Sequence, residues 1–432
     1  MRQIGVGIVG FGTVGAGVVE GLQRNRGKLA ERLEIDIALR RVADLDITSD
    51  RGVEIDTSIL TTDLTQVVGA PDIDIVVELI GGSGIARTVV RDALEAGQSV
   101  VTANKKLLAE HGAELFSLAE SKGVDLYFGA SVGGGIPIIR TIREALSGNR
   151  VESVLGILNG TCNYILTRME SAGLSFDDAL AEAQQQGYAE ADPTLDVDGF
   201  DTLHKAAILA ALAYGFTPDL ESLSAIGIRG VVEAEDIRYA KELGYRIKLL
   251  GIIRGEDGKV EVRVAPTLVP QSSMLGSVDG VFNAALVKCD LADTTLYYGR
   301  GAGRLPTAST VIGDIADVAF NIVHEAPLKV IVPKSRKPVE LKPVSEVMSR
   351  HYLRISIKDE VGTMAKLTGV LAANNVSIGS VMQKTSSQTT ASPVPVIILT
   401  HQARQADIEA ALEEIGRLEI VDRPPVSLGI EE

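Results

Sequence analysis

Five carboxylates and one lysine lie between residues 190 and 205; they are Glu190, Asp192, Asp196, Asp198, Asp201 and Lys205. Pro193 and Gly199 break regular structure, which predicts a loop leading into a helix. Carboxylates this close repel one another unless they face water or a cation, such as a bound ammonium group. Because apolar residues flank Lys205, it is a candidate for a lowered pKa and for proton transfer. The alternative is an acidic surface loop with an Asp201–Lys205 salt bridge at a helix start.

A glycine turn follows the first apolar run of the chain. In GFGTVG, Gly10, Gly12 and Gly15 stand between a strand expected over 4–9 and a helix expected over 14–29. Gly10 permits a tight turn, Gly12 lets the backbone approach a pyrophosphate, and Gly15 lets helix and strand pack closely. The helix N-terminus offers free N–H groups to the phosphates. The segment predicts dinucleotide binding, with a purely structural turn as the alternative.

The end of the second expected strand, 35–43, bears on the choice of coenzyme. Asp44 is placed to accept hydrogen bonds from a ribose hydroxyl, which favours NAD. It lies 29 residues after Gly15, later than the usual spacing of about 20. Arg40 and Arg41 are placed to meet a 2′-phosphate instead, which favours NADP. A solvated charge cluster is the third interpretation.

The elements that must position these residues fall into three patterns. Up to about residue 130, apolar strands alternate with helices, which predicts an α/β fold with a Rossmann-type doubly wound parallel sheet. After Pro137, long helices among strand-like pieces predict an α+β domain, to which the family resemblance given below assigns catalysis and dimerisation. From residue 352 the order is βαββαβ, which is ferredoxin-like, with a last strand expected to open at 419–420. The expected boundaries are 1–135, with 300–325 returning to it, then 136–299, a linker over 326–349, and 350–432.

Composition excludes several classes of protein. The chain has 432 residues, with 42 basic against 57 acidic side chains and a net charge of −15. That balance argues against nucleic acid or an anionic membrane as the main partner. Two cysteines, Cys162 and Cys289, cannot form a disulfide framework and fit a reducing cytoplasm. The N-terminus lacks a signal-peptide pattern, and the most apolar helical stretch is too short to span a bilayer.

Further segments extend the pattern along nearly the whole chain: VVELIGG (76–82), VTANKKLLA (101–109), ASVGGGIPI (130–138), LNGTCNYIL (158–166) and GAGRLPTAS (301–309). Together with the glycine turn and residues 183–205, they resemble the homoserine dehydrogenase family, in its order. The resemblance implies an enzyme that uses NADP or NAD to interconvert L-homoserine and L-aspartate 4-semialdehyde. It also implies a place in threonine, methionine and isoleucine biosynthesis.

The resemblance assigns roles to individual residues. Lys205 falls on the catalytic acid/base, which would protonate the forming alkoxide, and Lys105 falls on a second lysine between nicotinamide and substrate. Glu190 falls on a residue that holds the substrate, and Asp196 and Asp201 are expected to receive the substrate ammonium group or to orient Lys205. Asp192 and Asp198 are expected to cap or solvate the loop. The positions implied to bind the coenzyme are Gly10, Phe11, Gly12, Thr13, Val14, Gly15, Asp44, Lys105 and Gly303.

One departure from the family concerns a monovalent cation such as Na⁺. Family members often bind it through a glutamate before ASV, and here that position is Gly129. The carbonyl groups of Val132, Gly134 and Ile136 remain available. The site nevertheless lacks the charged ligand that a hard cation prefers, which argues against cation binding here.

Residues 352–383 resemble an ACT domain, which implies amino-acid binding at the turn after the first strand and at a paired interface. Asp359, Gly362, Asn374 and Asn375 are the polar or turn residues near the expected site. The implied effector is L-threonine, and the implied assembly is a homo-oligomer, either a dimer or a tetramer. The alternative is a dimerisation module without a ligand.

Two other functions compete with this interpretation. One is a dehydrogenase of another amino-acid pathway, against which the Asp-Pro segment before Lys205 argues. The other is a coenzyme-binding sensor without catalysis. The retained Lys105, Glu190 and Lys205 argue against the sensor.

Overall fold

The computed structural model describes residues 1–326, 338–384 and 393–432. These residues form two compact units. The first comprises Met1–Val154, His204–Leu223 and Phe282–Val339, and the second comprises Leu155–Leu203, Ser224–Val281 and Glu340–Glu432. The unit boundaries fall within strand β7 (Val151–Ile157) and helix α8 (Phe200–Tyr214). Residues 327–337 of the expected linker, 326–349, lie outside the described residues, and the expected domain boundaries stay a prediction.

The first unit contains a six-stranded parallel sheet in the order β3-β2-β1-β4-β5-β6. Its strands are β1 (Arg2–Val9), β2 (Ile35–Ala43), β3 (Leu60–Thr61), β4 (Ile75–Glu78), β5 (Ser99–Thr102) and β6 (Leu126–Tyr127). The central strands are apolar without alternation because helices cover both faces of the sheet. This confirms the doubly wound Rossmann-type sheet.

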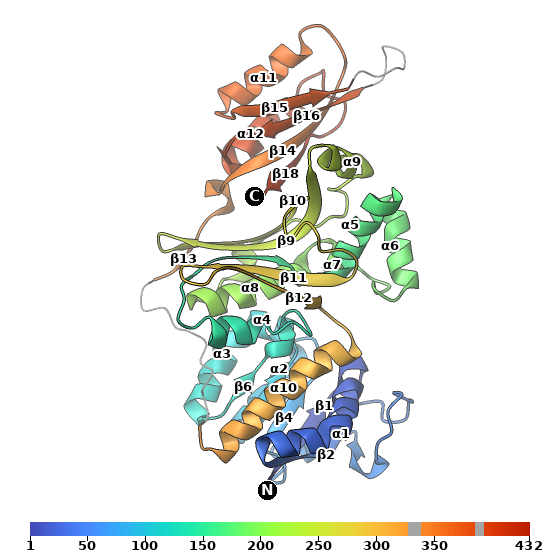
Figure 1. Cartoon of the computed structure of the whole chain (residues 1–432), viewed down its shortest axis with the longest axis vertical. Helices are drawn as coiled ribbons and strands as arrows, with labels where there is room; N and C mark the ends of the chain where they lie inside the picture. Colours follow the sequence, from blue (N-terminus) through green and yellow to red (C-terminus); the bar gives the residue numbers. More distant parts are fainter. Residues whose placement is uncertain (327–337, 385–392) are drawn as a thin grey trace. The chain divides into compact units, whose positions relative to one another are not determined.

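Helices α1 (Thr13–Leu33) and α10 (Arg304–Val323) pack side by side on one face of that sheet (Figure 1). Helices α2 (Gly84–Glu95) and α3 (Lys105–Lys122) pack on the other face. Gly17 lets α1 and α10 approach closely, since a Cβ there would lie 2.7 Å from the Arg304 carbonyl oxygen. Helix α10 therefore covers the same face as α1 although nearly 300 residues separate them in sequence. A hairpin of β11 (Phe282–Cys289) and β12 (Asp293–Arg300) precedes α10.

The second unit combines helices with an antiparallel pair of long strands. The helices are α5 (Gly160–Ala172), α6 (Phe176–Gln185), α7 (Thr194–Val197) and α9 (Ala234–Glu242), and the strands are β8 (Ser224–Ala225), β9 (Tyr245–Glu256) and β10 (Lys259–Pro270). β9 and β10 pair along their whole length. This mixed arrangement agrees with the α+β interpretation.

The C-terminal part of the second unit has the expected βαββαβ order. Its elements are β14 (Met348–Ile357), α11 (Thr363–Ala373), β15 (Ile378–Gln383), β16 (Val394–Thr400), α12 (Gln405–Gly416) and β18 (Val426–Ile430). The strands run in the order β18-β14-β16-β15, and apolar residues of both helices pack on the same side of them (Figure 1). The last strand was wrongly expected at 419–420, where the chain turns instead. Pro424 and Pro425 cannot donate to a ladder, so pairing with β14 starts after them, at Val426.

Candidate active site

The glycine turn lies between β1 and α1 at the carboxyl edge of the parallel sheet. Gly10 has φ +105°, and a Cβ there would meet the Leu79 carbonyl carbon at 2.6 Å. A Cβ on Gly15 would lie 2.1 Å from the Gly10 carbonyl oxygen, so strand and helix approach as closely as expected. A Cβ on Gly12 would meet nothing within 4 Å. The N-terminus of α1, including Thr13 and Val14, thus presents open backbone to a phosphate group.

Asp44 has a structural partner that its position in the sequence did not reveal. Its carboxylate accepts the N–H of Phe11 on the glycine turn and, at 2.9 Å, the N–H of Asp46. Arg40 donates to Gln3, and Arg41 donates to the carbonyl oxygen of Arg40 at 2.7 Å. Asp44 therefore supports the turn from the neighbouring strand end, where a ribose would also lie.

Glu78 is a buried carboxylate at the same edge, for which sequence reasoning proposed no role. It is fully buried at the end of β4 and accepts the Thr102 hydroxyl at 2.6 Å and the Ile80 N–H at 2.8 Å. Asn104 caps α3 by accepting the Leu107 N–H, and its side-chain amide lies 3.4 Å from Glu78. Glu78 thereby links the loop after β4 to the start of the helix that begins with Lys105. The one sign of this role in the sequence is that the apolar run before the glycine pair ends in a carboxylate, Glu78.

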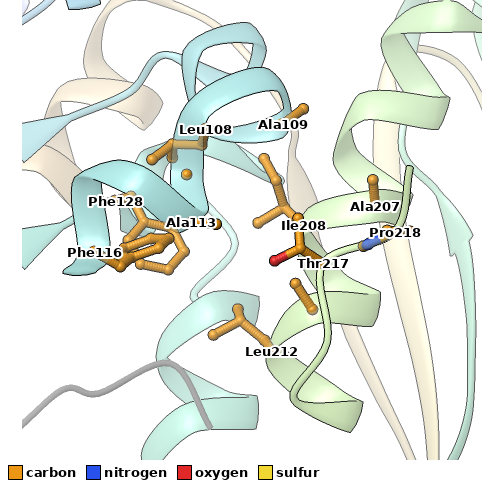
Figure 2. Close-up of a pocket in the computed structure, with 12 residues that line it drawn as sticks. Leu108, Ala109, Ala113, Phe116, Phe128, Ala207, Ile208, Leu212, Thr217 and Pro218 are labelled. Carbon is orange, nitrogen blue, oxygen red and sulfur yellow. The ribbon is translucent and has the colours of Figure 1, made fainter. Parts of the chain in front are cut away.

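The two candidate lysines stand on helices that share a cavity. Lys105 begins α3 and is half-buried, whereas Lys205 on α8 is 9% exposed. One turn beyond them, Leu108 on α3 and Ile208 on α8 line the same apolar cavity, which has about 40 Å³ open to the centres of water molecules. Figure 2 shows Leu108 and Ala109 at the end of the cavity where Ala207 lies, whereas Phe116 lies towards Leu212. Each lysine therefore precedes by one turn a residue that lines this cavity.

In the second unit, Asn159 joins two of the predicted carboxylates. Its side-chain amide donates to Asp196 at 2.7 Å and to Asp201 at 2.8 Å, while its oxygen accepts the Cys162 N–H and caps α5. Asp201 is 4% exposed, whereas Glu190 is exposed in the loop before α7. Asn159 was missed because its partners lie 37 and 42 residues away.

Of the remaining acidic residues of the loop, Asp192 makes the capping contact expected of it, whereas Asp198 forms an ion pair. Asp192 accepts the Thr194 N–H at 3.1 Å, and hydrogen bonds from Thr194 lower the pKa of Asp192. Asp198 forms an ion pair with Arg229.

The residues around Gly129 do not fit a monovalent cation site. The N–H of Gly129 donates to Asp314 at 2.7 Å, and a Cβ at position 129 would lie 2.8 Å from the Asp314 carboxylate. The Gly134 carbonyl already accepts the Thr310 hydroxyl at 2.7 Å. The Ile136 carbonyl accepts the Ile138 N–H at 2.8 Å, and residue 129 carries no carboxylate. Within the described ranges, no three His, Cys, Asp or Glu side chains are grouped to hold a metal ion.

The predicted coenzyme residue Gly303 caps the N-terminus of α10 with φ +122°. The predicted regulatory residues lie at opposite ends of α11. Gly362 precedes the helix with φ +90°, near exposed Asp359, whereas Asn374 and Asn375 follow its last turn. Eleven helical residues span about 16 Å, so these residues do not form one site in a single chain.

Comparison with known proteins identifies the family. A family model described as homoserine dehydrogenase matches residues 137–316, its NAD-binding domain matches 10–129, and an ACT domain matches 351–419. A homoserine dehydrogenase of Neisseria gonorrhoeae is 44% identical across 100% of this chain and 99% of its own length. This chain belongs to the homoserine dehydrogenase family.

Relatives and solved structures agree with that assignment. A homoserine dehydrogenase of Pseudomonas aeruginosa is 41% identical across 100% of both chains. The crystal structure of a homoserine dehydrogenase from Thiobacillus denitrificans has a TM-score of 0.92 and 41% identity, over 100% of this chain and 99% of that one. A hyperthermophilic archaeal homoserine dehydrogenase in complex with NADPH is 26% identical, with a TM-score of 0.63, over 74% of this chain and 98% of that one.

These findings confirm an oxidoreductase with a nicotinamide coenzyme and a C-terminal ACT domain. No helix in the described part of the chain is both long and apolar enough to cross a bilayer.

Proposed function

We propose that the enzyme interconverts L-aspartate 4-semialdehyde and L-homoserine, in the biosynthesis of threonine, methionine and isoleucine. The observation that carries this proposal is the burial of Lys205 on α8, a helix that lines one cavity together with α3, which begins with Lys105. A proton donor must reach the reacting oxygen in a site from which bulk water is excluded, and a buried lysine meets that condition.

The bound nicotinamide supplies the hydride in the direction of reduction. Lys205 donates a proton from Nζ to the aldehyde oxygen as it becomes an alkoxide, and takes it back in the reverse direction. Lys105 sits between coenzyme and substrate. Glu190, Asp196 and Asp201 hold the amino group of the substrate, and Asn159 fixes the latter two carboxylates by its hydrogen bonds. We propose no cation in this chemistry, because Asp314 accepts the Gly129 N–H where the family carries a carboxylate ligand.

The test replaces Lys205 by methionine, which keeps the length of the side chain and removes its charge. We expect kcat for semialdehyde reduction to fall by about 10²-fold or more, with the Kd of the coenzyme unchanged. Lys106→Met is the matched control, since Lys106 is exposed and pairs with Glu110. Near-normal turnover of Lys205→Met would refute the proton transfer. A panel of other aldehyde substrates separates this activity from that of related dehydrogenases.

The proposed coenzyme is NADPH or NADH. The proposed inhibitor is L-threonine, bound at the turn of Asp359 and Gly362, with a second copy of the chain supplying Asn374 and Asn375. The separation of these residues along α11 supports a paired site and hence a homo-oligomer. Steady-state rates with each coenzyme, with and without threonine, and the molecular mass in solution test these points. Threonine inhibition of a strictly monomeric enzyme would contradict the paired site.

A further inference from the structure

Strand β10 has a gap along one edge. Three short strands pair with that edge: β13 (Glu340–Leu341) at 259–260, β8 at 263–264 and β18 at 267–268. Between β8 and β18, Ala265 and Pro266 have no strand partner on this side among the described residues, and Pro266 has no N–H to offer. A cavity opens at this gap, with about 50 Å³ open to the centres of water molecules.

Arg263 presents hydrogen-bond donors to this cavity. The residue is 8% exposed, and its Nε donates to Glu261 at 2.6 Å. Its Nη2 lies 3.7 Å from Glu431, beyond hydrogen-bonding distance, and its Nη1 lies 3.9 Å from where a Cβ of Gly429 would be. Within the described part of the chain, Nε is the guanidinium atom with an acceptor. The two Nη atoms are not among the buried polar atoms that lack a partner, so they are open to the cavity, where water or a ligand can accept their hydrogen bonds.

The charges around Arg263 decide which class of ligand fits. Arg254 lies 2.8 Å from Glu431 and 3.8 Å from Glu261, and each glutamate also lies near Arg263. Two guanidinium groups thus balance two carboxylates, all partly or fully buried. A simple anion would add an unbalanced charge to this network, which is costly in a buried site, whereas a zwitterion would add none.

Neutral polar groups line the rest of the cavity. His351 is 2% exposed, with its ring nitrogens 2.9 Å from the Ser349 hydroxyl and 3.2 Å from the Ser427 hydroxyl. Burial and the charge of Arg263 lower the pKa of His351 to about 4, so the ring is neutral near pH 7. Ser224 and Gln405 complete the polar lining. Hydroxyl and amide oxygens of this kind accept hydrogen bonds from an ammonium group.

We propose that this cavity binds a small free α-amino acid, with its carboxylate on the Nη groups of Arg263 and its ammonium group on the oxygens of Ser224, Ser427 and Gln405. The site is separate from the Asp359 turn. Its walls come from β14 and β18 beside the ACT match and from β10 within the homoserine dehydrogenase match. A ligand there contacts both regions and couples them. Only the choice of an amino acid as the ligand rests on the regulation proposed above.

Calorimetry on the full-length protein tests this site with glycine, L-threonine and L-homoserine, and with acetate and inorganic phosphate as simple anions. A Cβ at position 429 meets nothing closer than Arg263 Nη1, at 3.9 Å, so Gly429→Val directs its methyl groups at the space beside Arg263, and valine suits a strand. The double variant Arg263→Met/Glu261→Gln removes one positive and one negative charge together, so the network stays balanced. We expect saturable amino-acid binding that weakens at least about tenfold in both variants.

Three results would overturn the proposal: no saturable amino-acid binding at millimolar concentration, equal affinity in the wild type and Gly429→Val, or tighter binding of acetate or phosphate than of any amino acid. The basal reduction of aspartate semialdehyde is measured in parallel. If the wild type does not reduce aspartate semialdehyde, the proposed enzyme function is wrong. The calorimetric comparison of the wild type with Gly429→Val does not depend on that activity.

Discussion

Asp314 gives the first unit a pH-dependent stability that can be worked out from its surroundings. The side chain is 6% exposed on α10 and accepts the N–H of Gly129. Burial raises the pKa of Asp314 to about 7, although the Gly129 hydrogen bond and the charge of Arg143 oppose the shift. The folded protein therefore keeps a proton over a pH range in which the unfolded chain, with its ordinary value of 3.8, has lost it.

The sign and size of the effect follow from this difference in bound protons. The contribution of Asp314 to stability is complete below pH 3.8 and is lost as the pH rises to about 7. A shift of roughly three pKa units corresponds to about 4 kcal/mol in total, of which about 3 kcal/mol is lost between pH 5 and pH 8. Asp314→Asn keeps the shape and an acceptor for the Gly129 N–H but does not titrate. The variant should therefore gain about 3 kcal/mol relative to wild type over that range.

Urea unfolding followed by far-ultraviolet circular dichroism at pH 5, 6, 7 and 8 measures the difference; the chain has no tryptophan to report by fluorescence. Asp317→Asn is the matched control, because Asp317 lies on the same helix, is partly exposed and pairs with Arg140. Its stability should track that of the wild type with pH. If the curves of Asp314→Asn and the wild type stay parallel from pH 5 to 8, the carboxyl group is not protonated in the folded protein and the reasoning fails.

Three further substitutions test the site. Asp44→Asn keeps an acceptor for the glycine turn but removes the charge, so the ratio of kcat/KM for NADPH to that for NADH should rise severalfold; an unchanged ratio removes Asp44 from the ribose site. Asn159→Ala removes one hydrogen bond each from Asp196 and Asp201 and should raise KM for aspartate semialdehyde about tenfold, with KM for the coenzyme unchanged. An equal rise in the two KM values would indicate that the substitution disturbs the fold as a whole. Gly129→Ala places a Cβ 2.8 Å from Asp314 and should cost about 1–3 kcal/mol; an unchanged Tm contradicts the close contact.

The parts of the fold that local sequence determines were predicted. The glycine turn is such a case, because the left-handed backbone of Gly10 and the close approach at Gly15 depend on a few neighbouring residues. Strand β2 and helix α8 were likewise found from the spacing of their apolar residues. The last strand was misplaced because the return to β14 depends on two prolines and a partner about 75 residues away.

The side-chain partners within the site could not be predicted, because they join residues far apart in the chain. Asp314 accepts a hydrogen bond from a residue 185 positions earlier, and Asp44 accepts one from a residue 33 positions earlier. The sequence suggested Asp44 as a ribose ligand from its place after a strand. It contained no signal that the same carboxylate supports the turn, since that contact needs β1 and β2 in register.

Three carboxylates compensate their burial with backbone N–H groups at the edge where a coenzyme binds. Asp44 accepts the Phe11 N–H from the loop after β1, Glu78 accepts the Ile80 N–H from its own loop, and Asp314 accepts the Gly129 N–H after β6. Each bond fixes a loop that follows a strand of the parallel sheet. Because hydrogen bonds already hold these loops, immobilising them costs little free energy when a coenzyme binds. The Asp314 bond also explains why residue 129 is a glycine, because a Cβ there would lie 2.8 Å from the Asp314 carboxyl group.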